Sequence, residues 1–172
     1  MQYHHDNQCN FLQPHRINEI FQSCTNSSKG ITILNQNIRS FDKNFDEFSV
    51  YFQNYLTKID VITFSETWFN DSICSPIPFY DGYHTVRPIR KGGGVSIYVK
   101  NGYRSSKLNK LSGIYSTFEV CATVIKINET FELYVVALYR PPDTSISDFF
   151  LEFGEYLFLN FSDTSNVIIT FY

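Results

Sequence analysis

Two short apolar runs flank an amphipathic segment in the first half of the chain. The first run, residues 31–34, leads into the polar residues 35–37, and the second, residues 60–66, closes on Ser65 and Glu66. Both patterns predict buried strands. Between them, aromatic and aliphatic residues recur at intervals of three and four, which predicts a helix over residues 42–57. Strand, helix and strand in this order predict a βαβ unit whose strands are parallel.

Asn37 and Glu66 each follow one of these two predicted strands. The carboxyl ends of parallel strands meet at the same edge of a sheet, so we expect the two side chains to lie close together. Sheets of this kind place their ligand sites at that edge. The sequence therefore predicts a candidate site that contains Asn37 and Glu66.

The second half of the chain is dominated by extended segments. After a loop that is rich in proline and glycine, strands are predicted at residues 95–99, 117–127 and 131–139. The turn residues Asn128, Glu129 and Thr130 between the last two segments favour an antiparallel meander.

A second helix and a final strand follow this meander. Residues 146–159 carry aromatic residues on one side, and Ser145 with Asp148 forms a capping signal before them. Residues 166–170, of which the last four are β-branched, predict a further buried strand. The predicted class is therefore α/β in the broad sense, or α+β.

Three consecutive glycines precede the strand at residue 95. The run Gly92–Gly94 lacks the Lys-Ser/Thr pair that follows the glycines of a nucleotide-binding P-loop, and it leads into a strand instead of a helix. We therefore expect it to form a tight strand entry with positive φ angles.

The composition supports one folded domain. The chain has 172 residues, of which 43% are hydrophobic and 17% aromatic, enough to fill a core and to exclude general disorder. Residues 1–29 have weaker periodicity, so we expect a loosely ordered leader there and a domain over residues 30–172.

The cysteines and the chain's apolar stretches exclude several other classes. Four scattered cysteines without a C-x-x-C pair predict reduced, mostly buried thiols and no zinc knuckle. The polar N-terminus lacks a secretory signal, and no apolar stretch reaches 18 residues. We expect an intracellular protein, in the nucleus or cytoplasm, that does not bind a membrane.

Charge is distributed unevenly along the chain. The net charge is −3, yet seven basic residues and no acidic ones lie between residues 87 and 110, so this segment carries +7 and the remainder −10. The seven are Arg87, Arg90, Lys91, Lys100, Arg104, Lys107 and Lys110. The segment is either a binding surface for the phosphates of a nucleic acid or a solvated hairpin, and both interpretations stay open.

Four motifs in order resemble the endonuclease domain of non-LTR (LINE-type) retrotransposons, within the endonuclease/exonuclease/phosphatase superfamily of deoxyribonuclease I. The resemblance covers residues 31–170. The motifs are Asn37-Ile38-Arg39-Ser40, Ser65-Glu66-Thr67-Trp68, Lys91-Gly92-Gly93-Gly94-Val95 and Leu138-Tyr139-Arg140-Pro141-Pro142.

This resemblance implies a fold and a chemistry. The fold is the deoxyribonuclease I-like four-layer α/β/β/α sandwich, of which this chain would form the first part. Glu66 would bind Mg²⁺, with Mn²⁺ as an alternative ion, Asn37 would lie beside the metal and orient the phosphate, and the Tyr139 hydroxyl would contact phosphate oxygens. Arg140 joins the basic residues as a candidate for binding the phosphate backbone of DNA. A reverse transcriptase in a longer polyprotein is a further implied partner.

Each of these three residues also has an ordinary structural interpretation. Asn37 could form a turn, Glu66 could cap a helix or lie on the surface, and Tyr139 could be a core aromatic residue. The case for catalysis depends on their occurring together.

Two motifs of the family are absent from the 172 residues. Relatives carry Gly-Asp-x-Asn after the strand that matches residues 167–170, and Ser-Asp-His later, and this sequence has neither. We therefore expect negligible turnover from this chain and an apolar sheet face left partly uncovered. The alternatives are a non-catalytic nucleic-acid-binding remnant that uses residues 87–110, and a phosphatase or exonuclease of the same superfamily.

Overall fold

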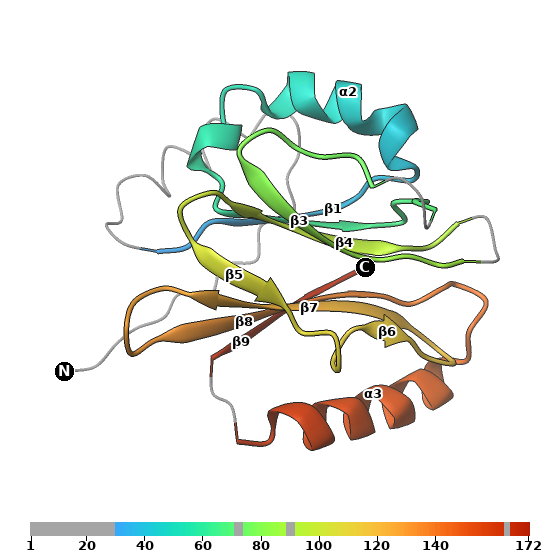
Figure 1. Cartoon of the computed structure of the whole chain (residues 1–172). Helices are drawn as coiled ribbons and strands as arrows, with labels where there is room; N and C mark the ends of the chain where they lie inside the picture. The colour runs from blue at the N-terminus through green and yellow to red at the C-terminus, as the bar shows by residue number, and fades with distance from the viewer. Residues whose placement is uncertain (1–29, 71–73, 89–91, 164–165) are drawn as a thin grey trace. The chain divides into compact units, whose positions relative to one another are not determined.

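Two mixed β-sheets lie face to face, and each carries one helix on its outer side (Figure 1). The computed structural model describes residues 30–70, 74–88, 92–163 and 166–172. The unit Ile31–Tyr172 contains both sheets and both helices. The predicted leader, residues 1–29, lies outside the described residues.

The first sheet has the strand order β1-β2-β4-β3, in which β1 and β2 are parallel and the other neighbours antiparallel. Helix α2 (Phe41–Phe52) and a short 3₁₀ helix (Leu56–Lys58) connect β1 to β2. The strands are β1 (Ile33–Asn37), β2 (Val61–Ser65), β3 (Tyr80–Thr85) and β4 (Val95–Lys100).

The second sheet has the order β5-β7-β8-β9, with β6 paired to β7. Strands β8 and β9 are parallel, and helix α3 (Ile146–Phe161) connects them. The strands are β5 (Arg104–Lys107), β6 (Gly113–Ile114), β7 (Glu119–Lys126), β8 (Glu132–Tyr139) and β9 (Val167–Phe171).

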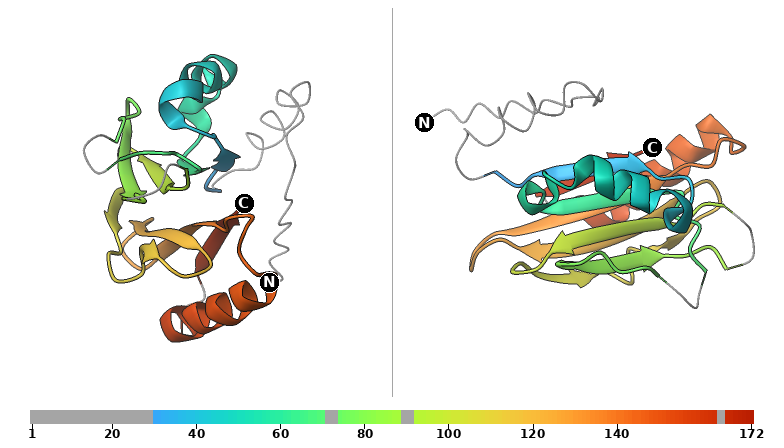
Figure 2. Two further views of the ribbon diagram at one scale, coloured as in Figure 1. Left: turned by 90° about the vertical axis from the view of Figure 1, so that its right-hand side faces the viewer. Right: turned by 90° about the horizontal axis from the view of Figure 1, so that it is seen from above.

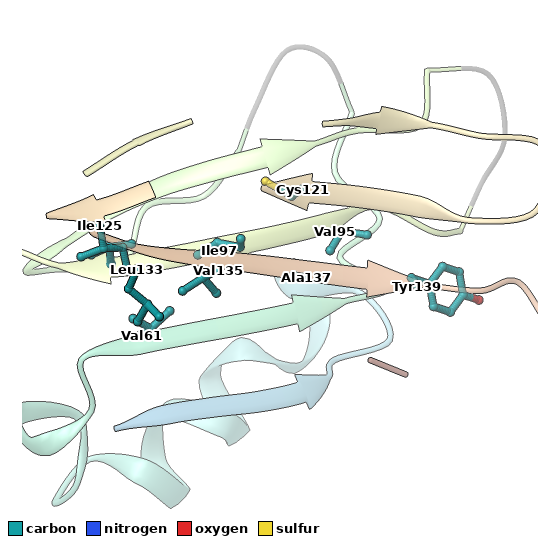
Figure 3. Close-up of a cluster of buried hydrophobic side chains, with 10 residues drawn as sticks. Val61, Val95, Ile97, Cys121, Ile125, Leu133, Val135, Ala137 and Tyr139 are labelled. Atoms are coloured by element: carbon teal, nitrogen blue, oxygen red, sulfur yellow. The ribbon is translucent and has the colours of Figure 1, made fainter. Parts of the chain in front are cut away.

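The main core lies between the two sheets. Alternate residues of β8 face it, because successive side chains of a strand point to opposite sides. Figure 3 shows this row on β8, which ends at Tyr139 at the carboxyl end of the strand. The buried members are Val61, Val95, Ile97, Val99, Cys121, Ile125, Leu133, Val135, Ala137 and Tyr139.

Each helix lies along the outer face of its own sheet (Figure 2). The side that faces the sheet buries aromatic residues. On α2, the Phe41 and Phe48 rings lie 5.5 and 5.0 Å from the ring of Phe64 on β2. On α3, the ring of Phe149 lies 6.0 Å from Phe118, which precedes β7. The unit therefore has the four layers helix, sheet, sheet and helix.

Most of the predicted elements are present. The βαβ unit is confirmed, because β1 and β2 are parallel and joined by α2. The meander of β7 and β8 and helix α3 are confirmed as well. Strand β9 is also present, but the prediction that it is buried is wrong, because its residues are half-buried or exposed. Ser145 caps α3 by accepting a hydrogen bond from the backbone N–H of Asp148. All three glycines at 92–94 have positive φ.

Three details differ from the sequence prediction. Helix α2 ends at Phe52, so the predicted helix was too long at its carboxyl end. Strand β3 was predicted as a loop; it is an edge strand with mostly half-buried or exposed residues, which leaves no clear hydrophobic pattern. The short strands β5 and β6 were not predicted for the same reason.

Among the described residues, no helix combines the length and the apolar character needed to cross a membrane.

Candidate active site

The carboxyl ends of strands from both sheets meet at one edge of the unit. Asn37 ends β1, Glu66 follows β2, and Arg87 follows β3, which runs in the same direction as β2. From the second sheet, Tyr139 ends β8 and faces the space between the sheets. The side chains predicted from the sequence therefore come together from two sheets.

Asn37 and Glu66 contact each other directly. The Asn37 amide donates a hydrogen bond from Nδ2 to Oε1 of Glu66 at 2.8 Å. Its oxygen Oδ1 accepts a hydrogen bond from the backbone N–H of Arg39 at 3.1 Å. These two bonds fix the orientation of the amide and hold one oxygen of the carboxylate in place.

The backbone of Glu66 and its neighbours is held on both sides. Ser40 donates its N–H to the Glu66 carbonyl at 2.8 Å, and Phe41 donates to the Thr67 carbonyl at 2.9 Å. On the other side, Thr67 donates to the Gly94 carbonyl at 3.2 Å, and Trp68 donates to the Gly93 carbonyl at 2.9 Å. The segment is therefore clamped between the start of α2 and the glycine run.

Unusual backbone angles gather in these same two segments. Arg39, Ser40, Glu66 and Trp68 have φ angles of 46°, 86°, 54° and 58°. Residues other than glycine rarely adopt positive φ, and such strain collects at functional sites. One of these residues with positive φ, Glu66, is the candidate metal ligand itself.

The Tyr139 hydroxyl lies against the Glu66 carboxylate. Burial raises the pKa of Tyr139 to about 12, and the negative charge of Glu66 and a hydrogen bond to it act in the same direction. The hydroxyl therefore keeps its proton at neutral pH and remains a donor. A phosphate oxygen near Glu66 could accept that hydrogen bond.

Glu119 is a component of the site that the sequence analysis missed. It is the cross-strand partner of Tyr139 and only 1% exposed. Its Oε2 accepts a hydrogen bond from the Gly94 N–H at 2.5 Å, and its Oε1 forms an ion pair with Arg87. Burial raises the pKa of Glu119, as does the charge of Glu66, whereas Gly94 and Arg87 lower it. An acidic residue inside the apolar run 117–127 was the available signal.

The glycine run fits tightly around this buried ion pair. A Cβ atom on Gly93 would lie 2.5 Å from Oε1 of Glu119 and 3.1 Å from Cζ of Arg87. A Cβ atom on Gly94 would lie 2.6 Å from Oγ1 of Thr67. The glycines are therefore needed for close approach as well as for their positive φ angles.

The donor set suits a hard divalent cation that keeps most of its water. Within the described part of the chain, no group of three or more His, Cys, Asp or Glu residues could hold a metal. Glu66 supplies one oriented carboxylate, beside which Asn37 presents its amide N–H donor, and a single carboxylate ligand is compatible with a Mg²⁺ or Mn²⁺ ion that keeps most of its waters.

The basic residues of the 87–110 segment do not gather at this site. Lys100 ends β4 at the opposite end of the sheet from Glu66, where its Nζ donates to the Thr57 carbonyl. Arg104 pairs with Lys126, also at the far end. Of the five basic residues of this segment that the structure describes, Arg87 contacts the site through its ion pair with Glu119.

The remaining basic candidates have separate positions. Lys107 Nζ donates to the His84 carbonyl near the end of β3, and Lys110 lies in the turn after β5. Arg140 follows Tyr139, but its guanidinium donates to the Thr144 carbonyl of its own loop at 2.9 Å. Arg90 and Lys91 lie outside the described residues.

Comparison with known proteins gives structural matches only. The chain matches no protein-family profile and no curated sequence. It is similar in structure to the endonuclease domain of TRAS1, a telomere-specific non-LTR retrotransposon, with a TM-score of 0.61 and 12% identity over 83% of this chain. The match to an AP endonuclease from Leishmania major has a TM-score of 0.55 and 13% identity, and it covers 82% of this chain. The match to TDP2 from D. rerio, solved with a single-strand DNA product, has a TM-score of 0.52 and 12% identity, and it covers 82% of this chain.

The chain spans only part of the length of these structures: 58% of the TRAS1 domain, 54% of the Leishmania enzyme and 58% of TDP2. The unit Ile31–Tyr172 contains both sheets and both covering helices. Residues 31–172 therefore have the deoxyribonuclease I-like fold of these proteins, which include a retrotransposon endonuclease domain.

Proposed function

We propose that Asn37, Glu66 and Tyr139 are the metal- and phosphate-binding part of a divalent-metal-dependent endonuclease site that acts on the phosphodiester backbone of DNA. The observation that carries the proposal is the contact of the Glu66 carboxylate with both the Asn37 amide and the Tyr139 hydroxyl. Structural similarity to nucleases supports it. A reverse transcriptase as partner remains an expectation from the resemblance, and a nuclear or cytoplasmic location remains an expectation from the sequence.

Each residue has a distinct task in this proposal. Glu66 holds Mg²⁺ or Mn²⁺, which when bound polarises a phosphate oxygen and offsets the charge of the phosphodiester. Asn37 keeps the carboxylate oriented and places an uncharged donor beside the phosphate. Tyr139, protonated at neutral pH, donates to a phosphate oxygen on which charge develops.

These three residues do not include a group that activates the attacking water. The Gly-Asp-x-Asn and Ser-Asp-His motifs, which would supply such groups in relatives, do not occur in the 172 residues. General acid–base catalysis increases the reaction rate by roughly 10²–10⁴-fold. When catalytic groups act as a unit, the loss of one removes most of the effect of the others. We therefore propose that the 172-residue chain binds metal and DNA but turns over negligibly.

The alternative is a remnant that binds nucleic acid through the 87–110 segment without metal. In the described structure, Lys100 and Arg104 lie at the far end of the sheets from Glu66. Binding through Lys100 and Arg104 would therefore cover a surface away from the candidate site, and it would not respond to substitution of Glu66.

A metal titration separates the two functions. Mn²⁺ binding to the 172-residue chain is followed by electron paramagnetic resonance, with Glu66→Gln as the test variant and Glu129→Gln as control, because Glu129 is 88% exposed in a surface pair with Lys126. We expect one Mn²⁺ site in the wild type and in Glu129→Gln, and its loss in Glu66→Gln. Equal Mn²⁺ binding by all three proteins would rule out Glu66 as the ligand.

Plasmid nicking in Mg²⁺ and in EDTA, assayed on the same preparations, measures turnover. We expect no nicking above background in either condition. Robust nicking that requires Mg²⁺ and Glu66 would contradict the expected inactivity while it supports the proposed site.

A further inference from the structure

A groove opens beside the site, between the end of β3, the β6–β7 hairpin and the loop after β8. Its volume is about 480 Å³, within the range of pockets that hold small ligands. Apolar and aromatic groups make up most of the lining, chiefly Pro88, Ile114, Tyr115, Phe118 and Pro141. Such a surface suits a flat, uncharged group better than a free anion.

The floor of this groove is rigid. The rings of Tyr115 and Phe118 stack with centroids 4.5 Å apart and an interplanar angle of 9°. Next to them, Ser116 and Thr117 donate their backbone N–H groups to the Glu152 carboxylate of α3 at 3.1 and 2.9 Å. The floor is therefore held in place by the second sheet and by α3.

Arg87 connects the groove to the candidate active site. Its side chain lines the groove and forms the ion pair with buried Glu119, and it is only 17% exposed. Its charge also acts on the Tyr139 hydroxyl, which contacts Glu66. A nucleic-acid strand that binds at Glu66 therefore lies next to this groove, on the side of the site where Tyr139 is located.

The charges around the groove exclude a simple phosphate pocket. Among the described residues that line the groove, Arg87 is the one cation, and Asp143 lies on the same lining with the opposite charge. A guanidinium held edge-on by a carboxylate keeps donors free for the polar edge of a heterocycle. A nucleobase has both features that the groove matches, a flat apolar face and a polar edge.

We propose that this groove is a subsite for the nucleobase next to the phosphate bound at Glu66, with Arg87 donating to the edge of the base. The proposal rests on the proposed function, because the active site defines which nucleotide reaches the groove. It implies that the chain prefers a DNA strand that carries bases over the same backbone without them.

The test compares two labelled single strands of about twelve nucleotides by fluorescence anisotropy at low salt, in EDTA and in Mn²⁺: an oligothymidylate and its abasic analogue. The groove variant is Ile114→Asp, at a residue 46% exposed, and the matched control is Val50→Asp on α2, at a residue 66% exposed. Both variants add one negative charge in place of an exposed aliphatic side chain, so both are expected to fold.

We expect the wild type and Val50→Asp to bind the oligothymidylate at least about fivefold more tightly than the abasic strand, which is the low end for one stacked base. Ile114→Asp should lose that preference. Equal affinity for both strands in the wild type, or a preference that persists in Ile114→Asp, would overturn the subsite. Glu66→Gln distinguishes the two proposals, since it should abolish Mn²⁺ binding yet keep the base preference in EDTA.

Discussion

At the scale of single residues, sequence reasoning found the groups at strand ends but not the buried acid behind them. Asn37 and Glu66 were predictable because both follow strands of one βαβ unit. Tyr139 was suggested by the resemblance, and its proximity to Glu66 depends on how the second sheet packs on the first. Glu119 was missed, since the importance of an acid inside an apolar strand depends on its partner Arg87, 32 residues earlier in the chain.

The buried pair of Glu119 and Arg87 predicts a large effect on stability. Glu119→Gln should lower the free energy of unfolding by roughly 2–4 kcal/mol, because it leaves the Arg87 guanidinium with no opposite charge in a mostly buried position. Denaturant unfolding measures this loss. The double variant Arg87→Gln/Glu119→Gln should be less destabilised than the sum of its single variants.

Glu129→Gln is the matched control for this substitution. It removes the same charge from a pair with Lys126 in which the Glu129 side chain is 88% exposed, so its effect should stay within experimental error. Equal losses of stability in Glu119→Gln and Glu129→Gln would show that the buried pair does not stabilise the fold.

At the scale of elements, the long amphipathic and apolar segments were predictable and the short edge strands were not. Helix α2 is an amphipathic helix between the partly buried strand β1 and the fully buried strand β2, and this alternation of patterns is visible in the sequence. Strand β3 exposes much of its surface at the edge of its sheet, so its composition resembles a loop. The glycine run was predicted as a strand entry, but the close approach of Glu119 and Thr67 needed three-dimensional information.

The glycine run yields a prediction with an internal control. Gly93→Ala should cost at least about 2 kcal/mol more in unfolding free energy than Gly102→Ala. Both residues have positive φ, 75° and 107°, so each substitution carries a backbone cost of about 1–2 kcal/mol. Only at Gly93 would the new Cβ also meet a buried carboxylate, at 2.5 Å. Equal losses in urea denaturation would contradict the tight packing of Gly93 on the ion pair.

At the scale of the whole unit, the four-layer arrangement follows from the sequence pattern only with help from the resemblance. The structure buries β7 and β8 on both faces, whereas the hydrophobic pattern predicts the two strands without saying which sheet or helix covers them. That information comes from long-range contacts between the sheets, which no local pattern encodes.

The outer surface of the unit predicts self-association of the 172-residue chain. Leu151, Phe158 and Leu159 on α3 are 75%, 72% and 69% exposed, and β9 forms an open edge of its sheet. Exposed apolar groups and strand edges favour aggregation. Light scattering coupled to size exclusion should show oligomers that grow with concentration, and the double variant Leu151→Glu/Phe158→Glu should reduce them. The control variant Val50→Glu on α2 should leave the oligomers unchanged. A wild-type protein that stays a monodisperse monomer at high concentration would contradict the prediction.

The central claim is that Glu66 binds a divalent metal that in turn binds a DNA phosphate, and linked binding tests it most directly. The affinity of the 172-residue chain for a short DNA duplex is measured by fluorescence anisotropy with Mn²⁺ and with EDTA, for the wild type, Glu66→Gln and Glu129→Gln. We predict that Mn²⁺ tightens DNA binding several-fold in the wild type and in Glu129→Gln but not in Glu66→Gln. Affinity that does not depend on Mn²⁺, or an equal gain in Glu66→Gln, would contradict the account.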